Sequence, residues 1–341
     1  MNLINILGGY FMDYKDKLKI ERLKAIFEDN FKITQLYANY LEHYPEVITK
    51  EMVEMLTESG ITKEEALVAM LSEIFGLNFE NADDRRLIME YLTPSVRIMN
   101  TERYTSNPYY QRVKIPNITD GRWELRQESY KPYRGVIVDD MVISNNFREY
   151  APLGFFTEEF HFPAVLEDGN EWMTLTPVDL DTCDVAISEA FGKVVTFGLG
   201  LGYYAFMVSE KESVDSITIV EKSPDVIRLF EKYISPYFKN PDKVRIVNAD
   251  AFEYAENIMP YENFDYAFVD TWRDAGDGAP MYEKMKKLEH LSPNTEFSYW
   301  IENFLISRVR ANRFSNILNK LDDGIDISYE DIEKELLSDV K

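Results

Sequence analysis

Cysteine and histidine are scarce in this chain, which has one cysteine and three histidines among 341 residues. Cys183 cannot form a disulfide within the chain, and such cysteine usage is typical of a reducing compartment. A lone thiol reacts only beside an activating base, so a small apolar filler is the ordinary interpretation. His43, His161 and His290 are scattered along the sequence, and we therefore expect no metal site.

Long hydrophobic runs are also absent from the sequence. The longest uncharged stretch, Val194 to Ser209, is shorter than the roughly 20 residues that span a bilayer. The chain begins with MNLINILGGYFM, an apolar segment without the basic residues that open a signal peptide. The sequence thus predicts a cytoplasmic protein with no membrane partner.

Positive charge is in the minority. Lysine and arginine number 37 against 60 aspartates and glutamates, which gives a formal net charge of −23. An acidic surface repels nucleic-acid phosphates, so nucleic acid is not an expected partner. Whole-chain charge leaves room for a local basic patch, and the densest basic stretch contains Arg122, Arg126, Lys131 and Arg134.

What the chain does contain is a globular composition, with 45% hydrophobic and 14% aromatic residues. Its length predicts two to three domains at about 150 residues each. Apolar residues at helical spacing and a capping box of Thr62 and Glu65 indicate helices before Pro94. Short β-type runs, MVIS, FHFPAV and EWMTLT, follow among prolines. The predicted units are a helical N-terminal domain (1–100), a small β-rich segment (101–182), an α/β domain (183–303) and C-terminal helices (304–341).

Strands and helices alternate regularly within the third unit. The expected strands lie near 193–198, 216–221, 244–248, 265–270 and 296–302. The expected helices begin at Tyr203 or span 224–235 and 280–290. This alternation predicts an α/β fold with a Rossmann-like, doubly wound and mostly parallel sheet. Apolar residues on one face after Glu302, with Ser328 as a later cap, predict helices in place of a terminal strand hairpin.

A glycine-rich turn follows the first of these strands. The segment KVVTFGLGLG contains Gly198, Gly200 and Gly202. Glycine lets a backbone approach a ligand that a Cβ would repel, and the helix that follows points free N–H groups at the ligand. Ligands of open α/β sheets bind beyond the carboxyl ends of the strands. We therefore expect a nucleoside cofactor at this turn.

Three acidic residues stand at the ends of later strands: Glu221 after SITIV, Asp250 after VRIVNA and Asp270 in FDYAFVDTW. Glu221 follows the glycines at close to the usual separation of about 20 residues, which lets an acid reach the ribose hydroxyls. A dinucleotide fingerprint would need a further glycine where the chain has Tyr203. A dinucleotide fold, or a glycine turn with unrelated surface acids, is the alternative interpretation.

The G-x-G-x-G spacing with an acid after the third strand resembles the class I S-adenosylmethionine-dependent methyltransferases over residues 183–303. The resemblance implies that the glycine turn holds the methionine part of S-adenosylmethionine. It also implies that Glu221 binds the ribose and that Asp250 faces the adenine amine. The cofactor-binding residues implied in this way are Gly198, Leu199, Gly200, Gly202, Glu221, Lys222, Asp250 and Ala251.

One position departs from that family. Thr196 stands where many of these methyltransferases carry an acid for the methionine ammonium. The spermidine synthase-like branch tolerates this loss, and IVEKSPDVI and FDYAFVDTWRDAGDGAP resemble its second and fourth strand ends. True aminopropyltransferases of that branch receive amines with acids at the positions of Leu201 and Arg273. An apolar residue and a cation cannot bind an ammonium group, so polyamine synthesis is disfavoured.

We therefore predict a methyltransferase that acts on a small molecule or a protein. Asp270 matches the catalytic acid of the spermidine synthase-like branch and is the candidate base, unless it only caps the next turn. The loop from Thr271 to Gly278 would line the acceptor side, with Trp272 as a stacking surface. A non-catalytic interaction or regulatory protein and an aminopropyltransferase-like enzyme are the alternatives. The helical block could serve a homodimer contact.

One motif lies outside the α/β domain. Residues 107–110 read NPYY, similar to the N-P-P-Y motif of amino-methyltransferases, which belongs at the end of the fourth strand. Here it precedes the glycine turn, so we interpret it as an ordinary proline turn. Tyr203 and Trp172 are interpreted as wall residues of the site.

Overall fold

A computed structural model describes residues 14–338. Residues 1–13 and 339–341 lie outside the described part of the chain, and so do the apolar beginning MNLINILGGYFM and the outer ends of the first and last predicted units.

A five-stranded parallel sheet forms the centre of the predicted α/β domain. Its strands, in chain order, are β10 (Gly192–Phe197), β11 (Val214–Glu221), β12 (Val244–Asn248), β13 (Tyr266–Val269) and β14 (Glu296–Tyr299). Their spatial order is β12-β11-β10-β13-β14, and every neighbouring pair is parallel. The order reverses at β10, and the crevice at such a switch point is where α/β sheets bind ligands.

Successive strand residues point to opposite faces of this sheet. Val194 and Phe268 pack in one core with α10 (Tyr203–Ser209) and α11 (Pro224–Tyr233). Val195 and Val269 pack in another core with α12 (Ala251–Asn257), α13 (Ala275–Lys286) and α14 (Glu302–Asp322). The sheet is thus covered on both faces, and the prediction of a Rossmann-like, doubly wound, parallel sheet is confirmed at the level of fold class.

Two helices of this domain differ from the sequence expectation. Helix α12 was not expected between the third and fourth strands, yet Asp250 caps it by accepting hydrogen bonds from the backbone N–H groups of Phe252 and Glu253. Helix α13 begins at Ala275 rather than at 280, because Asp274 and Asp277 form a capping box at its start. After β14 the described chain continues into α14 and α15 (Tyr329–Leu337), and Ser328 caps α15 as expected.

The β-rich segment folds into small sheets. The largest is antiparallel with the order β2-β3-β8-β9. Its members are β2 (Ile118–Asp120), β3 (Trp123–Tyr130), β8 (Phe160–Glu167) and β9 (Asn170–Thr174). The other strands are β4 (Gly135–Ile137), β5 (Val142–Ile143), β6 (Glu149–Tyr150) and β7 (Leu153–Phe156). Strand β1 (Val96–Met99) lies within the predicted helical unit and pairs with β7. The runs MVIS, FHFPAV and EWMTLT overlap β5, β8 and β9. Strand β3 was not predicted, because its sequence WELRQESY contains many polar residues.

Short helices complete this region. They are α6 (Thr101–Thr105), α7 (Pro108–Arg112) and α8 (Pro177–Asp181), and α9 (Asp184–Glu189) follows at the start of the α/β domain. The N-terminal helices are α1 (Tyr14–His43), α2 (Lys50–Thr57), α3 (Lys63–Ile74), α4 (Ala82–Leu87), a π-helical turn (Ile88–Leu92) and α5 (Thr93–Ser95). The predicted capping box of Thr62 and Glu65 opens α3.

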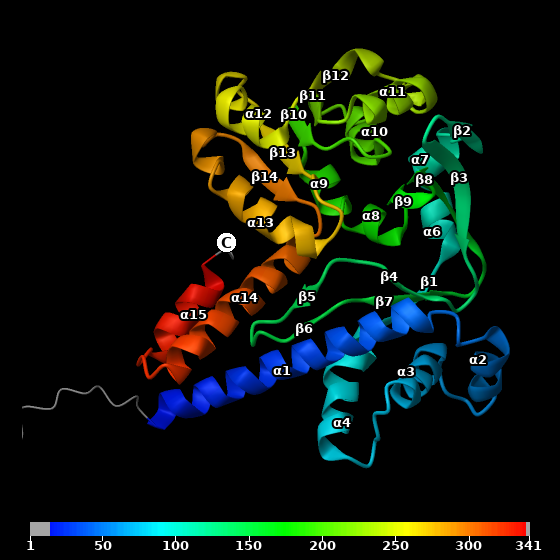
Figure 1. Cartoon of the computed structure of the whole chain (residues 1–341). Coiled ribbons are helices and arrows are strands. Elements are labelled where there is room, and N and C mark those ends of the chain that lie inside the picture. Colours follow the sequence, from blue (N-terminus) through cyan, green and yellow to red (C-terminus); the bar gives the residue numbers. More distant parts are fainter. Residues whose placement is uncertain (1–13, 339–341) are drawn as a thin grey trace, which may run out of the picture.

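Helix α1 packs against both the other N-terminal helices and the C-terminal helices. Its second half packs through Tyr37 and Tyr40 against the other N-terminal helices and β7. Its first half packs through Ile20 and Leu23 in one core with residues of α14 and α15, such as Ile332. Figure 1 shows α1 running below the strands β4 to β7 toward α15. The N-terminal helices and the C-terminal helices are thus joined by one element.

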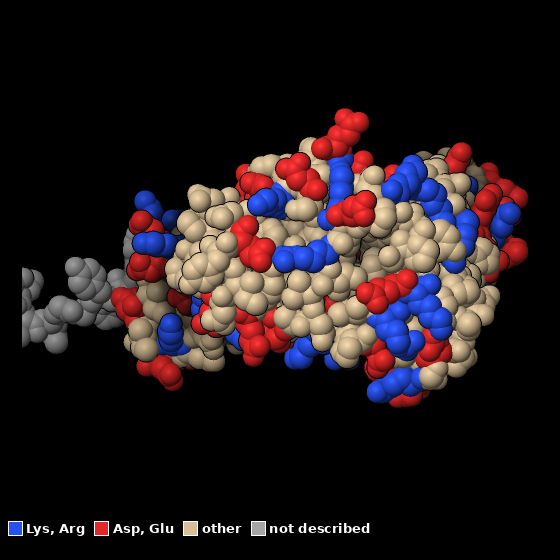
Figure 2. All heavy atoms as spheres, turned by 90° about the horizontal axis from the view of Figure 1, so that it is seen from above, with Lys and Arg blue, Asp and Glu red and all other residues tan. Residues whose placement is uncertain are grey.

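Two surface properties concern partners. Among residues 14–338 no helix combines the length and the apolar character needed to cross a membrane. On the face that Figure 2 shows, Lys and Arg side chains are interspersed with Asp and Glu and form no continuous basic patch.

Candidate functional site

A cavity of about 500 Å³ opens at the carboxyl ends of β10, β11, β12 and β13, a size typical of small-molecule sites. Most of its lining comes from the α/β domain: Gly198, Leu199, Gly200, Val220, Glu221, Lys222, Ala249, Asp250, Ala251, Phe252, Asp270, Thr271, Trp272, Arg273, Met281 and Trp300. The β-rich segment adds Glu171, Trp172, Met173, Thr174 and Asp179. All but one of the predicted cofactor-binding and catalytic residues line this cavity, as does Trp172, whereas Tyr203 borders a smaller adjacent pocket.

The glycine turn forms part of the cavity floor. Gly198 has φ +97°, and a Cβ on it would collide with the backbone carbonyl oxygen of Asp270. Only glycine therefore allows the ends of β10 and β13 to approach this closely. Gly200 has φ +51° and lies against the sulfur of Met173.

Gly202 is the exception among the predicted cofactor-binding residues. It does not line the cavity; its φ is +69°, and a Cβ there would meet the ring of Phe230 in α11. Its conformation opens α10, whose N-cap it is. The structure thus gives Gly202 a packing role, and the expected contact with a cofactor has no support in the geometry.

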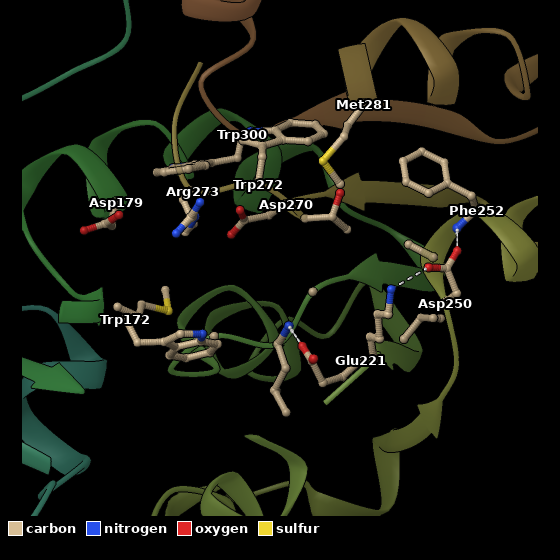
Figure 3. A pocket seen from close by; sticks show the side chains of 18 of the residues that line it. Trp172, Asp179, Glu221, Asp250, Phe252, Asp270, Trp272, Arg273, Met281 and Trp300 are labelled. Carbon is tan, nitrogen blue, oxygen red and sulfur yellow. Dashed lines mark hydrogen bonds and ion pairs between the residues drawn. The ribbon is translucent and has the colours of Figure 1, made fainter. Parts of the chain in front are cut away.

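Glu221 lies at the end of β11 and faces the cavity (Figure 3). One carboxylate oxygen accepts the backbone N–H of Leu199 at 3.1 Å, and the other accepts that of Ser223 at 2.7 Å. These bonds fix the carboxylate beside the glycine turn. Each carboxylate oxygen can accept more than one hydrogen bond, so Glu221 retains capacity for two ligand hydroxyls.

Asp250 stands at the opposite edge of the cavity from Asp179 in Figure 3. It caps α12, and Lys222 lies 3.4 Å from its carboxylate. Partial burial opposes ionisation, but the α12 N–H groups and Lys222 hold the pKa of Asp250 below its ordinary value. Ala251 follows at the first position of the helix. Glu221, Asp250 and Ala251 thus line neighbouring parts of one wall.

Asp270 lies deep in the cavity, directly after β13. Among the described residues no donor binds its carboxylate, and α13 is capped by Asp274 instead. The interpretation of Asp270 as a cap is therefore not what the geometry shows. Burial, then the charges of Asp179 and Glu221, raise the pKa of Asp270 to about 8. A carboxyl group of that kind can exchange a proton near neutral pH.

Asp179 is a second buried carboxyl group in the same cavity, and sequence reasoning did not single it out. One of its oxygens accepts the backbone N–H and the hydroxyl of Thr176 at 2.7 and 2.9 Å. Burial raises the pKa of Asp179 to about 6. The signal in the sequence was the pattern Thr176-x-x-Asp179, a capping box. Because this pattern lies in the β-rich segment, it offered no reason to place Asp179 near the glycine turn.

Three tryptophans border the cavity near these two acids: Trp172, Trp272 and Trp300. Figure 3 shows Trp172 across the opening from Trp272 and Trp300. Trp300 follows β14 directly and was missed, although the rule that ligands bind at strand ends applies to it as well. Trp272, expected as a stacking surface, is only 5% exposed, and its ring lies parallel to that of Tyr299.

The cations at the cavity are peripheral. The Lys222 side chain is 80% exposed and pairs with Asp250, and that of Arg273 is 81% exposed and pairs with Asp277 at 3.5 Å. The interior is therefore acidic, with Asp179, Glu221 and Asp270 among its walls. Within residues 14–338, no group of three or more histidine, cysteine and acidic side chains has the arrangement of a metal site.

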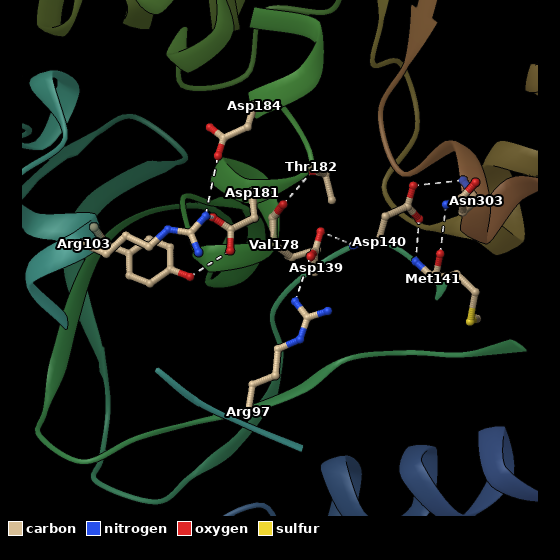
Figure 4. Close-up of polar contacts among 11 residues, drawn as sticks. Arg97, Arg103, Asp139, Asp140, Met141, Val178, Asp181, Thr182, Asp184 and Asn303 are labelled. Carbon is tan, nitrogen blue, oxygen red and sulfur yellow. Dashed lines mark hydrogen bonds and ion pairs between the residues drawn. The ribbon is translucent and has the colours of Figure 1, made fainter. Parts of the chain in front are cut away.

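Figure 4 shows polar contacts of Asp181, at the end of α8, and of Asp140 with Asn303, in the first turn of α14. Asp181 in α8 accepts hydrogen bonds from Arg103 and from the Tyr104 hydroxyl, both at 2.8 Å. Asp140 accepts the backbone N–H groups of Asn303 and Phe304 at the start of α14, at 2.9 and 3.0 Å. The Asp181 contacts thus join two parts of the β-rich segment, and the Asp140 contacts join that segment to the start of α14.

No family model matches the chain, and no curated protein matches it in sequence. A spermidine synthase in complex with the transition-state analogue AdoDATO aligns with a TM-score of 0.33 at 16% identity, over 54% of this chain and 64% of that chain. The spermidine synthase from Thermotoga maritima aligns with a TM-score of 0.32 at 15% identity, over 60% of this chain and 72% of that chain.

The chain therefore spans less than two thirds of the first of these structures. Likeness at such identities and TM-scores assigns neither a family nor a reaction to this protein. The cofactor contacts, the homodimer and the cytoplasmic location stay predictions.

Proposed function

We propose that this protein binds S-adenosylmethionine in the cavity and transfers its methyl group to an amine. The observation that carries the proposal is the joint placement of Glu221, Asp250 and Asp270 around one cavity at the switch point of a parallel sheet. The spacing of the glycine turn and the absence of a glycine at Tyr203 favour this cofactor over a dinucleotide.

The adenosine would occupy the end of the cavity between Glu221 and Asp250. The fixed carboxylate of Glu221 is suited to accept hydrogen bonds from two ribose hydroxyls, and Asp250 to accept one from the adenine amine. Phe252 lines the same end and offers an apolar contact. The methionine part, with its sulfonium, would then extend along the glycine turn toward Asp270.

The acceptor would occupy the other end, beside Asp179 and the tryptophans. Carboxylates and aromatic faces together favour a cation, because both attract positive charge. An amine satisfies this condition in its protonated form. To react it must lose a proton, and Asp270 is the base we propose. The nitrogen lone pair then forms the N–CH₃ bond while the S–CH₃ bond breaks, and the electron pair of that bond stays on sulfur.

Aminopropyl transfer is the second candidate function, and a specific observation favours it. Leu201 and Arg273 lack the carboxylates that receive amines in aminopropyltransferases, but Asp179 brings a buried carboxylate to the same cavity from α8. Incubation with decarboxylated S-adenosylmethionine and 1,4-diaminobutane, followed by mass spectrometry, separates the two reactions. An aminopropylated product, in place of a methylated one, would establish the second.

Titration calorimetry with S-adenosylhomocysteine tests the cofactor site directly. We expect micromolar binding by the wild type and about 10- to 100-fold weaker binding by Glu221→Ala, because that variant loses charged hydrogen bonds to the ribose. Glu256→Ala serves as a control, because Glu256 is exposed on the adjacent α12 and does not line the cavity. If the wild type binds neither S-adenosylhomocysteine nor S-adenosylmethionine, the protein is not a methyltransferase. If it also binds neither decarboxylated S-adenosylmethionine nor NAD, only the non-catalytic alternative remains.

A panel of acceptors tests the amine. Methylamine, ethanolamine, 1,4-diaminobutane and a lysine-containing peptide are each incubated with methyl-labelled S-adenosylmethionine, next to the uncharged alcohols of matching size. Label in an amine, and in none of the alcohols, is the expected result. Label in an alcohol would contradict the argument from the acidic lining.

A further inference from the structure

The NPYY segment, Asn107 to Tyr110, contacts both walls of the cavity from outside. The Asn107 side-chain amide donates a hydrogen bond to the Tyr203 hydroxyl at 3.0 Å, at the start of α10. The Tyr109 hydroxyl donates to the Leu201 carbonyl in the glycine turn at 2.6 Å. The Tyr110 hydroxyl donates to the Leu175 carbonyl at 2.5 Å, in the connection from β9 to α8.

The contact between Tyr109 and the glycine turn is fully enclosed. Tyr109 is 1% exposed and Leu201 is 2% exposed. The Tyr109 ring also meets Tyr203 and Phe206 edge-on, with ring centroids 5.6 and 5.2 Å apart. Leu201 lies before the start of α10, so its carbonyl has no partner within the helix. A buried carbonyl without a partner is costly, and Tyr109 provides that partner.

The turn needs such support because of its composition. Three of its five residues are glycines with positive φ, namely Gly198, Gly200 and Gly202. Glycine restricts the backbone least of all residues, so the turn by itself specifies its conformation weakly. The backbone N–H of Leu201 donates to the Met173 sulfur at 3.2 Å. Both backbone polar groups of Leu201 are thus held by the β-rich segment.

Tyr110 acts on the opposite wall. Leu175, which it contacts, joins Met173 and Trp172 on β9 to Asp179 on α8. A displacement of this connection would move Asp179 relative to the glycine turn. The two adjacent tyrosines therefore connect the wall that carries the predicted cofactor contacts to the wall that carries the second buried acid.

We propose that Tyr109 and Tyr110 are positioning residues that set the spacing between these two walls, Tyr109 for the glycine turn and Tyr110 for the connection that carries Asp179. One consequence rests on the proposed function: with the walls held at this spacing, the methyl group and the acceptor nitrogen lie in line. Displacement reactions lose rate steeply when the reacting atoms are misplaced. The NPYY motif thus has a role at the site without touching a reacting atom.

Hydrogen exchange on the ligand-free protein tests the support of the turn. In Tyr109→Phe the amide of Gly202, which donates to the Leu199 carbonyl at 2.8 Å, should exchange about five- to tenfold faster, because the turn opens more often. The amide of Leu175, which donates to the Pro163 carbonyl at 3.0 Å, should be unchanged. In Tyr110→Phe the amide of Leu175 should exchange faster, and the amide of Gly202 should be unchanged.

Tyr37→Phe is the matched control. The Tyr37 hydroxyl is also buried and hydrogen-bonded, but its partner is Ser95 among the N-terminal helices. It should leave both amides unchanged. Equal exchange of Gly202 in the wild type and in Tyr109→Phe would overturn the proposal, and so would a Tyr37→Phe effect as large as that of Tyr109→Phe.

Binding of S-adenosylhomocysteine, measured by calorimetry, gives a second readout. Tyr109→Phe should weaken it about tenfold, whereas Tyr110→Phe should leave it within about twofold, because the Tyr110 wall faces the acceptor. Equal weakening by both variants would contradict the division of roles. If the wild type does not bind this ligand, the proposed function fails while the exchange result still decides on the two tyrosines.

Discussion

Replacing Gly198 with alanine is expected to destabilise the protein by about 3 kcal/mol or more and to abolish binding of S-adenosylhomocysteine. The added Cβ would collide with the backbone carbonyl oxygen of Asp270 at a residue whose φ is +97°. The end of β13 is held in place, because the Asp270 N–H donates to the Phe197 carbonyl at 2.8 Å. The clash therefore separates two central strands. Thermal unfolding should show a midpoint lowered by roughly 5 °C or more.

Gly169→Ala separates the clash from the backbone strain. Gly169 has a similar φ of +80°, in the turn from β8 to β9, but nothing lies within 4 Å of the position that its Cβ would take. Its replacement should cost only the left-handed strain, about 1 kcal/mol, and should leave ligand binding unchanged. If both variants unfold at the same temperature, the close approach of β10 and β13 is not what requires glycine at 198.

The strands of the α/β domain could be predicted because each is a short apolar run bounded by turn residues. The run before the glycines became β10 at Gly192–Phe197, and SITIV became the buried part of β11. The parallel order followed from the alternation with helices. Helix α12 was missed because its N-cap residue, Asp250, had been interpreted only as a ligand contact. The structure shows that the residue caps the helix and lines the cavity as well.

The site could be predicted only where its residues stand at strand ends of the α/β domain. Glu221, Asp250 and Asp270 are of that kind, and they share one cavity. Trp172 was expected as a wall residue and lines the cavity, but Asp179 and Met173 reach it through the packing of a different unit, and no local pattern reports such packing. Gly202 shows the opposite failure, because a glycine required by the Phe230 ring cannot be distinguished in sequence from one required by a ligand.

The same limit applies to NPYY. Its position before the glycine turn argued against a catalytic role, and Asn107 does cap the short helix α7 as a proline turn would suggest. The contacts of its tyrosines with Leu201 and Leu175 depend on how α7 packs against α10 and β9. The sequence of NPYY itself carries no signal of these contacts.

Replacing Asp270 with asparagine is expected to slow methyl transfer by about 10²- to 10⁴-fold, the usual contribution of a general base. Affinity for S-adenosylhomocysteine should stay within about threefold, because that ligand lacks the sulfonium charge and Asp270 forms no hydrogen bond with the described residues. In the wild type the rate should rise with pH as the carboxyl group ionises. It should level off at or below pH 8, since the bound cations favour the ionised form.

The same substitution has a signature that needs no acceptor. Burial, with the charges of Asp179 and Glu221, raises the pKa of Asp270 to about 8 in the folded protein, far above the ordinary value near 4 of an unfolded chain. A raised carboxyl pKa means that the folded state binds the extra proton. Its stabilising effect is therefore complete below about pH 4 and is lost as the pH rises toward 8.

Asparagine cannot ionise, so thermal unfolding at pH 5.5 and 8.5 should show Asp270→Asn gaining stability relative to the wild type at the higher pH. Parallel behaviour of the two proteins across this range would mean that Asp270 is already ionised at pH 5.5, and a base that weak would have little capacity to take a proton from an ammonium group.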